Sequence, residues 1–187
     1  MKTLSYKRTV LVFMLLISAV TILTPLSAQT TMSILPVNTV SVNTQLLNAQ
    51  QWQGVSLQMQ DHFVSQLANI GTITKLSREH ILLLLKEMPV TDPESLNGDA
   101  YKIISKKENL HYLLKCSIES IQIIDRNVIA PIRVIIVDGN NGKVFWDKVL
   151  KINRIVPNPT VTEQILLNDV FKPSIIEISK EIKTLKY

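Results

Sequence analysis

Apolar side chains recur at two different periods along this chain, and each period predicts a type of secondary structure. Between residues 55 and 70 they are spaced by three or four positions, with Val55, Met59 and Phe63 in one register. That spacing is typical of a helix with one buried face. Between residues 110 and 119 apolar and polar side chains alternate instead, which is typical of a strand. The chain therefore combines helices with strands.

The next helices are indicated by the residues at their ends. Gly71 is expected to close the first helix as a C-cap glycine. Ser77 is placed to cap a second helix through "REHILLLLKEM". The five consecutive apolar residues of that helix, 81–85, predict burial on more than one side. After a boundary at Asp92-Pro93, a third helix is expected over about residues 97–108.

The last helix is expected to begin in "TVTE", Thr160–Glu163, which has the form of a capping box. Apolar residues then recur at helical spacing as far as Leu185. Pro173 lies inside this pattern. Because proline lacks a backbone N–H, we expect it to kink or restart the helix.

Five strands are expected, over residues 32–37, 72–76, 110–119, 128–137 and 144–152. Between the last two, "DGNNG" (Asp138–Gly142) predicts a hairpin turn, because Gly and Asn adopt positive φ at little cost. Pro131 has no N–H to donate, so we expect it at a sheet edge or a strand start. Residues 38–54 are uncharged and rich in Asn, Gln, Thr and Ser, and they are expected to form a loop.

The predicted order of elements is β-α-β-α-α-β-β-β-α. This order favours an α/β (α+β) domain with a single mixed β-sheet flanked by helices. Residues 29–187 are expected to form this domain, because 159 residues are enough to bury one ordinary core.

The start of the chain has the three parts of a secretory signal peptide. Lys2, Lys7 and Arg8 precede an apolar run over residues 10–23, and small residues follow Pro25. The run is shorter than the roughly 20 residues that a membrane span needs. We therefore expect residues 1–28 to be cleaved and the chain to reach the periplasm or be secreted. Retention as an inner-membrane anchor is the alternative.

Removal of the signal changes the charge of the chain. Three of the 20 basic residues leave with it, so 17 basic residues remain against 15 acidic ones. A net charge of +2 gives no support for nucleic-acid binding. The single cysteine, Cys116, lies mid-strand and far from the cleavage site, so it is expected to be a buried apolar side chain and not a lipid anchor.

Short motifs in this order resemble those of a family of bacterial envelope domains that includes CsgG, the amino-terminal domain of TolB, and LpoB. The first strand ends in Leu35-Pro36, and a later strand closes on Ser77-Arg78 before a leucine-rich helix with the late Glu87. The words "NLHYLLKCSI" (109–118) and "DGNNGKVFW" (138–146) follow. The resemblance implies a CsgG/LpoB/TolB-N-like α/β domain in the cell envelope.

The chain also departs from this pattern. Val37 stands where the family has an aromatic residue, and Cys116 replaces a strand glycine. The sequence has no lipid-anchor cysteine, no room for the hairpins of a CsgG-like pore, and no propeller as in TolB. The resemblance therefore implies the fold and the compartment, and it does not imply pore formation.

Residues with catalytic potential are scattered. His62, His80 and His111 lie on separate elements and lack metal-ligand spacing. The sequence has neither a Gly-x-Ser-x-Gly motif nor a glycine-rich phosphate loop. Asp138 lies close to two asparagines, but the EF-hand pattern is absent and turn chemistry explains these residues. We expect no enzyme activity, no cofactor and no metal.

Two hypotheses from different classes follow. The preferred one is a non-enzymatic envelope protein that binds a protein partner in outer-membrane assembly, secretion or wall synthesis. A homo-oligomer and a peripheral association with the membrane are compatible with it. The alternative is a small exported hydrolase whose site is assembled from distant residues.

The candidate partner-binding residues are Trp52, Leu46 and Leu47, which stand out in an otherwise polar segment. Tryptophan is enriched among the residues that anchor protein interfaces. The other interpretation of Trp52 is that it packs against the helix that follows.

Overall fold

The computed structural model describes residues 30–39, 46–89, 92, 96–158 and 160–187. The predicted signal peptide lies outside these residues. The elements are β1 (Thr31–Ile34), α2 (Ala49–Leu67), β2 (Thr72–Lys75), α3 (Arg78–Leu84), α4 (Gly98–Glu108), β3 (Tyr112–Ile118), β4 (Gln122–Ile124), β5 (Asn127–Asp138), β6 (Val144–Ile155), α5 (Glu163–Ile165), the π-helical η1 (Leu166–Phe171) and α6 (Lys172–Ile182). The predicted order is confirmed except for β4, a short extra strand.

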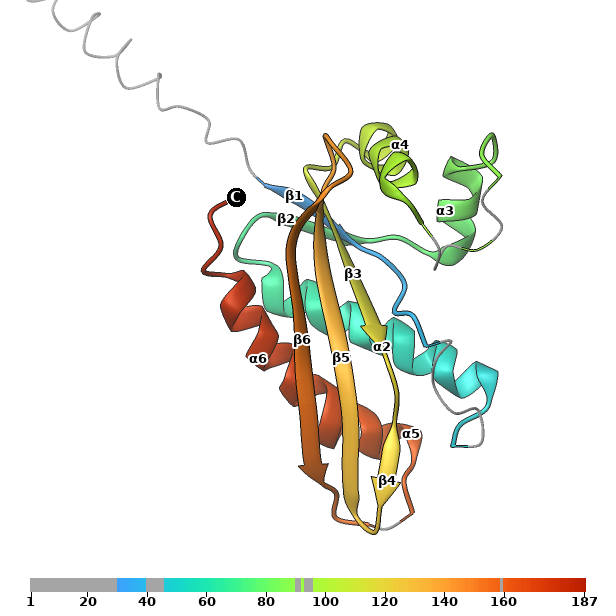
Figure 1. The fold of residues 1–187 in the computed structure, drawn as a ribbon, viewed down its shortest axis with the longest axis vertical. Helices are drawn as coiled ribbons and strands as arrows, with labels where there is room; N and C mark the ends of the chain where they lie inside the picture. Colours follow the sequence, from blue (N-terminus) through green and yellow to red (C-terminus); the bar gives the residue numbers. More distant parts are fainter. Residues whose placement is uncertain (1–29, 40–45, 90–91, 93–95, 159) are drawn as a thin grey trace, which may run out of the picture.

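The strands form one mixed sheet, as predicted (Figure 1). β1 runs parallel to both β2 and β3. β5 runs antiparallel to β3 and to β4, which follow one another along the same side of β5. β6 pairs with the other side of β5 over its whole length. Three strands, β2, β4 and β6, therefore pair on one side only, and β2 and β6 lie at opposite margins of the sheet.

Pro131 lies in the middle of β5, so the prediction of an edge or strand-start position is wrong. Its carbonyl oxygen accepts a hydrogen bond from the N–H of Glu119, 3.0 Å away. The nitrogen and oxygen of one residue point to the same side of an antiparallel strand, so the nitrogen of Pro131 faces the break between β3 and β4. Because the ladder is interrupted at this break, a proline without an N–H is tolerated in a central strand.

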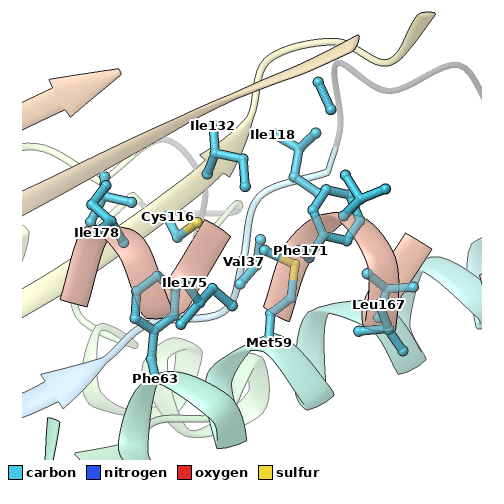
Figure 2. Packing of buried hydrophobic residues seen from close by; sticks show 14 of the residues in the cluster. Val37, Met59, Phe63, Cys116, Ile118, Ile132, Leu167, Phe171, Ile175 and Ile178 are labelled. Carbon is cyan, nitrogen blue, oxygen red and sulfur yellow. The ribbon is translucent and has the colours of Figure 1, made fainter. Parts of the chain in front are cut away.

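Two helical layers cover the sheet. α2, η1 and α6 lie on one face, where Met59 and Phe63 of α2 point toward Phe171 and Ile175 (Figure 2). Burial raises the pKa of the Cys116 thiol, which lies in this core as predicted. α3 and α4 cover the opposite face at one end only (Figure 1). Among the described residues, no helix covers the rest of that face.

Several helix ends differ from the predictions. α2 begins at Ala49, because Asn48 and Gln51 form a capping box; the predicted loop over 38–54 is wrong from that point. α2 ends at Leu67, before Gly71. Gly71 instead allows the backbone of Thr30 to pass close by, since a Cβ on residue 71 would lie 2.0 Å from the carbonyl oxygen of Thr30.

The C-terminal helix begins two residues later than predicted. Its N-cap is Thr162, whose hydroxyl accepts from the N–H of Ile165, and Thr160 is not the cap. A wide π-helical turn precedes Pro173, which lies in the first turn of α6. The N–H of Lys172 donates to the carbonyl of Leu167, five residues back. The backbone stays helical across this junction, so the helix passes through a π-helical turn before Pro173 and does not restart there.

The hairpin turn is confirmed. Gly142 has a φ of 68°, and a Cβ there would also strike the backbone of Gly98. The carboxylate of Asp138 accepts hydrogen bonds from the N–H of Asn140 and from the side-chain amide of Asn141, at 2.8 and 2.7 Å. Asp138 therefore acts as a turn residue.

α3 buries one side. Ile81 and Leu85 are buried in the apolar core under α3 and α4, but Leu83 between them is 63% exposed. The predicted burial on more than one side is wrong, because nothing in the described chain covers the outer face of α3.

Candidate functional site

Two polar side chains buried in α2 join this helix to the carboxyl ends of β1 and β2. The hydroxyl of Ser56 accepts from the N–H of Val37 at 3.0 Å and donates to the carbonyl of the same residue at 3.2 Å. The side-chain amide of Gln60 donates to the carbonyls of Ile34 and Leu76, at 3.0 and 3.1 Å. These bonds fix the position of α2 where the two parallel strands end.

A pocket of about 520 Å³ opens at this point. The crevice beyond the carboxyl ends of parallel strands is a common place for a binding site. Its apolar wall includes Val37, Trp52 and Leu57, and its polar rim includes Arg78 and Glu79. Leu57 is 44% exposed, so it presents an apolar surface to anything that enters.

The rim is held by hydrogen bonds at the start of α3. The guanidinium of Arg78 lies 3.1 Å from the carboxylate of Asp92. Glu79 accepts from its own backbone N–H and from the hydroxyl of Ser77, and these bonds lower the pKa of its carboxyl group. Both charges lie near the surface, so the pocket has an apolar wall and a charged rim.

The three predicted residues lie together at the start of α2. Leu47 and Trp52 are each 4% exposed and belong to the main core, and Leu46 packs against it half-buried. Trp52 contributes to the pocket wall, and its indole nitrogen is buried without a hydrogen-bond partner. Burial at this level fits the packing interpretation of Trp52. From the sequence, Arg78 and Glu79 could form a charged site, but capping and surface solvation explain them more simply. Leu57 was missed as a candidate, because only the fold brings α2 next to the end of β2.

A second pocket, of about 530 Å³, lies on the other face of β2. Thr31, Thr72 and Thr74 contribute to its lining. Nε2 of His80 lies 2.9 Å from a carboxylate oxygen of Glu108, which is also in the lining. His80 is thus the one histidine of the predicted three that meets a carboxylate in a pocket of the described structure.

The other two histidines are elsewhere. His62 lies in α2, where burial and then the charge of Lys172 lower its pKa. Nδ1 of His111 lies 3.1 Å from the N–H of Thr31 at the start of β1. Across the described ranges, no three His, Cys, Asp or Glu side chains gather as metal ligands would.

The helices in the described part of the chain are all too short or too polar to cross a membrane.

Several known structures have an architecture similar to that of this chain. CT253 of Chlamydia trachomatis matches with a TM-score of 0.52 and 12% identity, over 83% of this chain and 96% of that one. Lipoprotein GNA1162 of Neisseria meningitidis matches with a TM-score of 0.50 and 12% identity, over 83% and 99%. The chain shares their fold. The α/β fold expected from the resemblance in the sequence motifs is confirmed.

The C-terminal domain of LpoB from Salmonella enterica is more distant, with a TM-score of 0.44 and 15% identity over 72% of this chain and 90% of that one. No protein-family model and no curated protein matches the sequence. At these identities the likeness concerns the fold alone.

Proposed function

We propose that this chain is an exported, non-enzymatic protein of the bacterial cell envelope that binds another protein through the pocket at the carboxyl ends of β1 and β2. The observation that carries the proposal is the pocket itself, with an apolar wall at Trp52 and Leu57 and a charged rim at Arg78 and Glu79. This combination suits an apolar side chain of a partner with polar groups beside it.

Export and the single domain of residues 29–187 belong to the same proposal. The sequence pattern of residues 1–28 supports a cleaved signal, and a lipoprotein is among the proteins that share the fold. N-terminal sequencing of the protein recovered from cells tests this part. A start at Gln29 supports export with cleavage, and an intact Met1 supports a retained anchor.

Leu57 provides the sharper test of partner binding. A photo-reactive amino acid at position 57 is expected to crosslink a single envelope protein in living cells, whereas the same group at Leu83, on the outer face of α3, is not. In protein without the photo-reactive group, Leu57→Glu should reduce the amount of that envelope protein recovered by pull-down without lowering the melting temperature by more than about 2 °C, because exposed positions contribute little to stability. Equal adducts from positions 57 and 83 would reject the pocket as the binding site.

The hydrolase alternative has one observation in its favour, the pairing of His80 with Glu108 in the second pocket. A carboxylate that orients an imidazole is part of many general-base sites. Purified protein should then turn over a generic ester, phosphate or glycoside substrate, and His80→Asn should abolish this turnover. Absence of turnover in the unaltered protein would eliminate the alternative.

A further inference from the structure

The outer edge of β6 has free main-chain groups. Even-numbered residues of β5 face β6, because Pro131, an odd-numbered residue, faces β3 through its bond from Glu119. In the observed register Ile132 is paired with Leu150 and Val134 with Lys148. The even-numbered residues of β6 therefore bond to β5. The N–H and C=O groups of Asp147, Val149 and Lys151 point away from the sheet, where no described strand pairs with them.

This edge is also apolar. Of the eight large apolar side chains most exposed in the described part of the chain, four belong to β6, namely Val144, Phe145, Val149 and Ile155. Soluble proteins normally protect an edge strand with charges, prolines or short length. β6 extends over twelve residues, and Figure 1 shows it at the margin of the sheet.

Three of the four charged residues of β6 are already paired. The ammonium group of Lys148 lies 2.7 Å from the carboxylate of Glu181 in α6, and Arg154 lies 3.6 Å from Glu177. Asp147 pairs with Arg133 of the neighbouring strand β5. Lys151 is exposed. A long apolar edge with most of its charges neutralised is suited to pairing with another strand.

We propose that two copies of this chain pair through β6, antiparallel, about a two-fold axis at Val149. In this register Asp147 faces Lys151 of the second copy, and the reverse pair repeats on the other side of the axis. On the helix-covered face, Trp146 faces Ile152 and Lys148 faces Leu150 of the second copy. The outward main-chain groups of residues 147, 149 and 151 all find partners, as an isologous interface requires.

Charge selects this register over its neighbours. An axis at Lys148 or at Lys151 sets two lysines directly opposite each other, and an axis at Asp147 does the same with two aspartates. An axis at Leu150 gives no pair of opposite charges. The axis at Val149 alone among these joins opposite charges, and opposite charges directly across two strands are stabilising.

The dimer does not depend on the proposed partner-binding function. β6 and β2 are opposite margins of the sheet, so the pocket beside β2 stays accessible when β6 is paired. Loss of partner binding in a Leu57 variant and loss of dimers in a β6 variant are therefore separate results.

Cysteine crosslinking tests the register. Directly opposed residues in a hydrogen-bonded antiparallel pair have Cα atoms about 5.5 Å apart, within reach of a disulfide. In protein purified after export, Val149→Cys should form a covalent dimer on oxidation or with a short bis-maleimide, and Asn153→Cys should not. Cys116 is buried and does not interfere. The matched control is Thr72→Cys on the β2 edge. Equal crosslinking at positions 72 and 149 would reject the proposal.

Sedimentation tests the charge pair. Lys151→Glu sets a glutamate opposite Asp147 twice in each dimer and should raise the dimer dissociation constant about tenfold or more, since like charges across an interface are costly. Lys86→Glu makes the same charge change on the far side of the chain and should leave the constant unchanged. The proposal is rejected if the unaltered protein stays monomeric at millimolar concentration, or if β6 is occupied by a different protein.

Discussion

The two faces of the sheet carry apolar cores of very different size. In the described chain, 26 buried residues pack under α2, η1 and α6, against ten under α3 and α4. The two cores share β3 and β5, in which neighbouring residues such as Leu113 and Leu114, or Val137 and Ile136, point to opposite faces. Because stability follows buried apolar surface, the larger core holds the sheet together and the smaller layer is the part that opens first.

Both pockets lie beside the smaller layer. The first uses Arg78 and Glu79 at the start of α3, and the second uses His80 of the same helix and Glu108 at the end of α4. Binding surfaces are often drawn from the less stable end of a structure. The comparison indicates that the larger, more stable half of this protein positions a more adaptable half, which carries the proposed binding pocket.

The largest expected effect is in the larger core. Phe63→Ala removes a fully buried ring that packs between α2 and α6. We expect a loss of about 3–5 kcal/mol in the free energy of unfolding, measured in urea, because both transfer energy and a cavity contribute. Leu57→Ala on the exposed side of the same helix is the control. A loss below 1 kcal/mol at Phe63 would show that this core is not the main source of stability.

Ile104→Ala makes the corresponding change in the smaller core. The side chain is fully buried in α4, and we expect a loss of about 2–4 kcal/mol. Hydrogen exchange should show that amides of α3 and α4 lose protection while those of α2 and β5 keep theirs. Uniform loss across all elements would mean that the two layers unfold as one unit.

Gln60→Met tests the junction between the layers. The substitution keeps the length of the side chain but leaves the carbonyls of Ile34 and Leu76 without their buried donor. We expect about 1–3 kcal/mol of destabilisation by thermal unfolding. Partner crosslinking from position 57 should also weaken, because the strand ends beside the pocket are released. Unchanged stability would show that Gln60 does not join the strands.

The smallest effect concerns pH. Burial lowers the pKa of His62 below its usual value of 6.5. The folded state therefore favours the neutral ring, and the contribution of His62 is complete above pH 6.5 and is lost as the pH falls through the folded pKa. His62→Gln should make the melting temperature less sensitive to pH between about 7 and 5. A pH profile identical to that of the unaltered chain would contradict this assignment.

The fold class was predictable because its signals are periodic or local. The alternation over residues 110–119 and the turn residues around Gly142 each depend on a few neighbouring side chains. β4 was missed because three residues are too few to establish a period. The start of α2 was missed although Asn48 and Gln51 carry a capping signal, because the polar composition of this segment suggested a loop.

The candidate site was less predictable, because it depends on how distant elements meet. Trp52 and Leu47 look exposed in a polar stretch, yet α2 begins early enough to turn both into the core. The apolar residue that remains accessible in the pocket is Leu57, which the sequence places on the polar side of the helix. Whether Leu47 or Leu57 stays accessible is decided only by how α2 packs against the end of β2.

The position of β1 has a consequence for how the chain reaches this structure. β1 is the first described element of the sequence, yet it lies inside the sheet, with β2 on one side and Met32 aligned with Tyr112 of β3 on the other. A chain that emerges from its amino terminus therefore exposes an apolar strand whose β3 side stays unpaired until more than half of the chain has followed. Closing that long loop is entropically costly and slow, so the newly emerged chain passes through a period in which it is prone to aggregate.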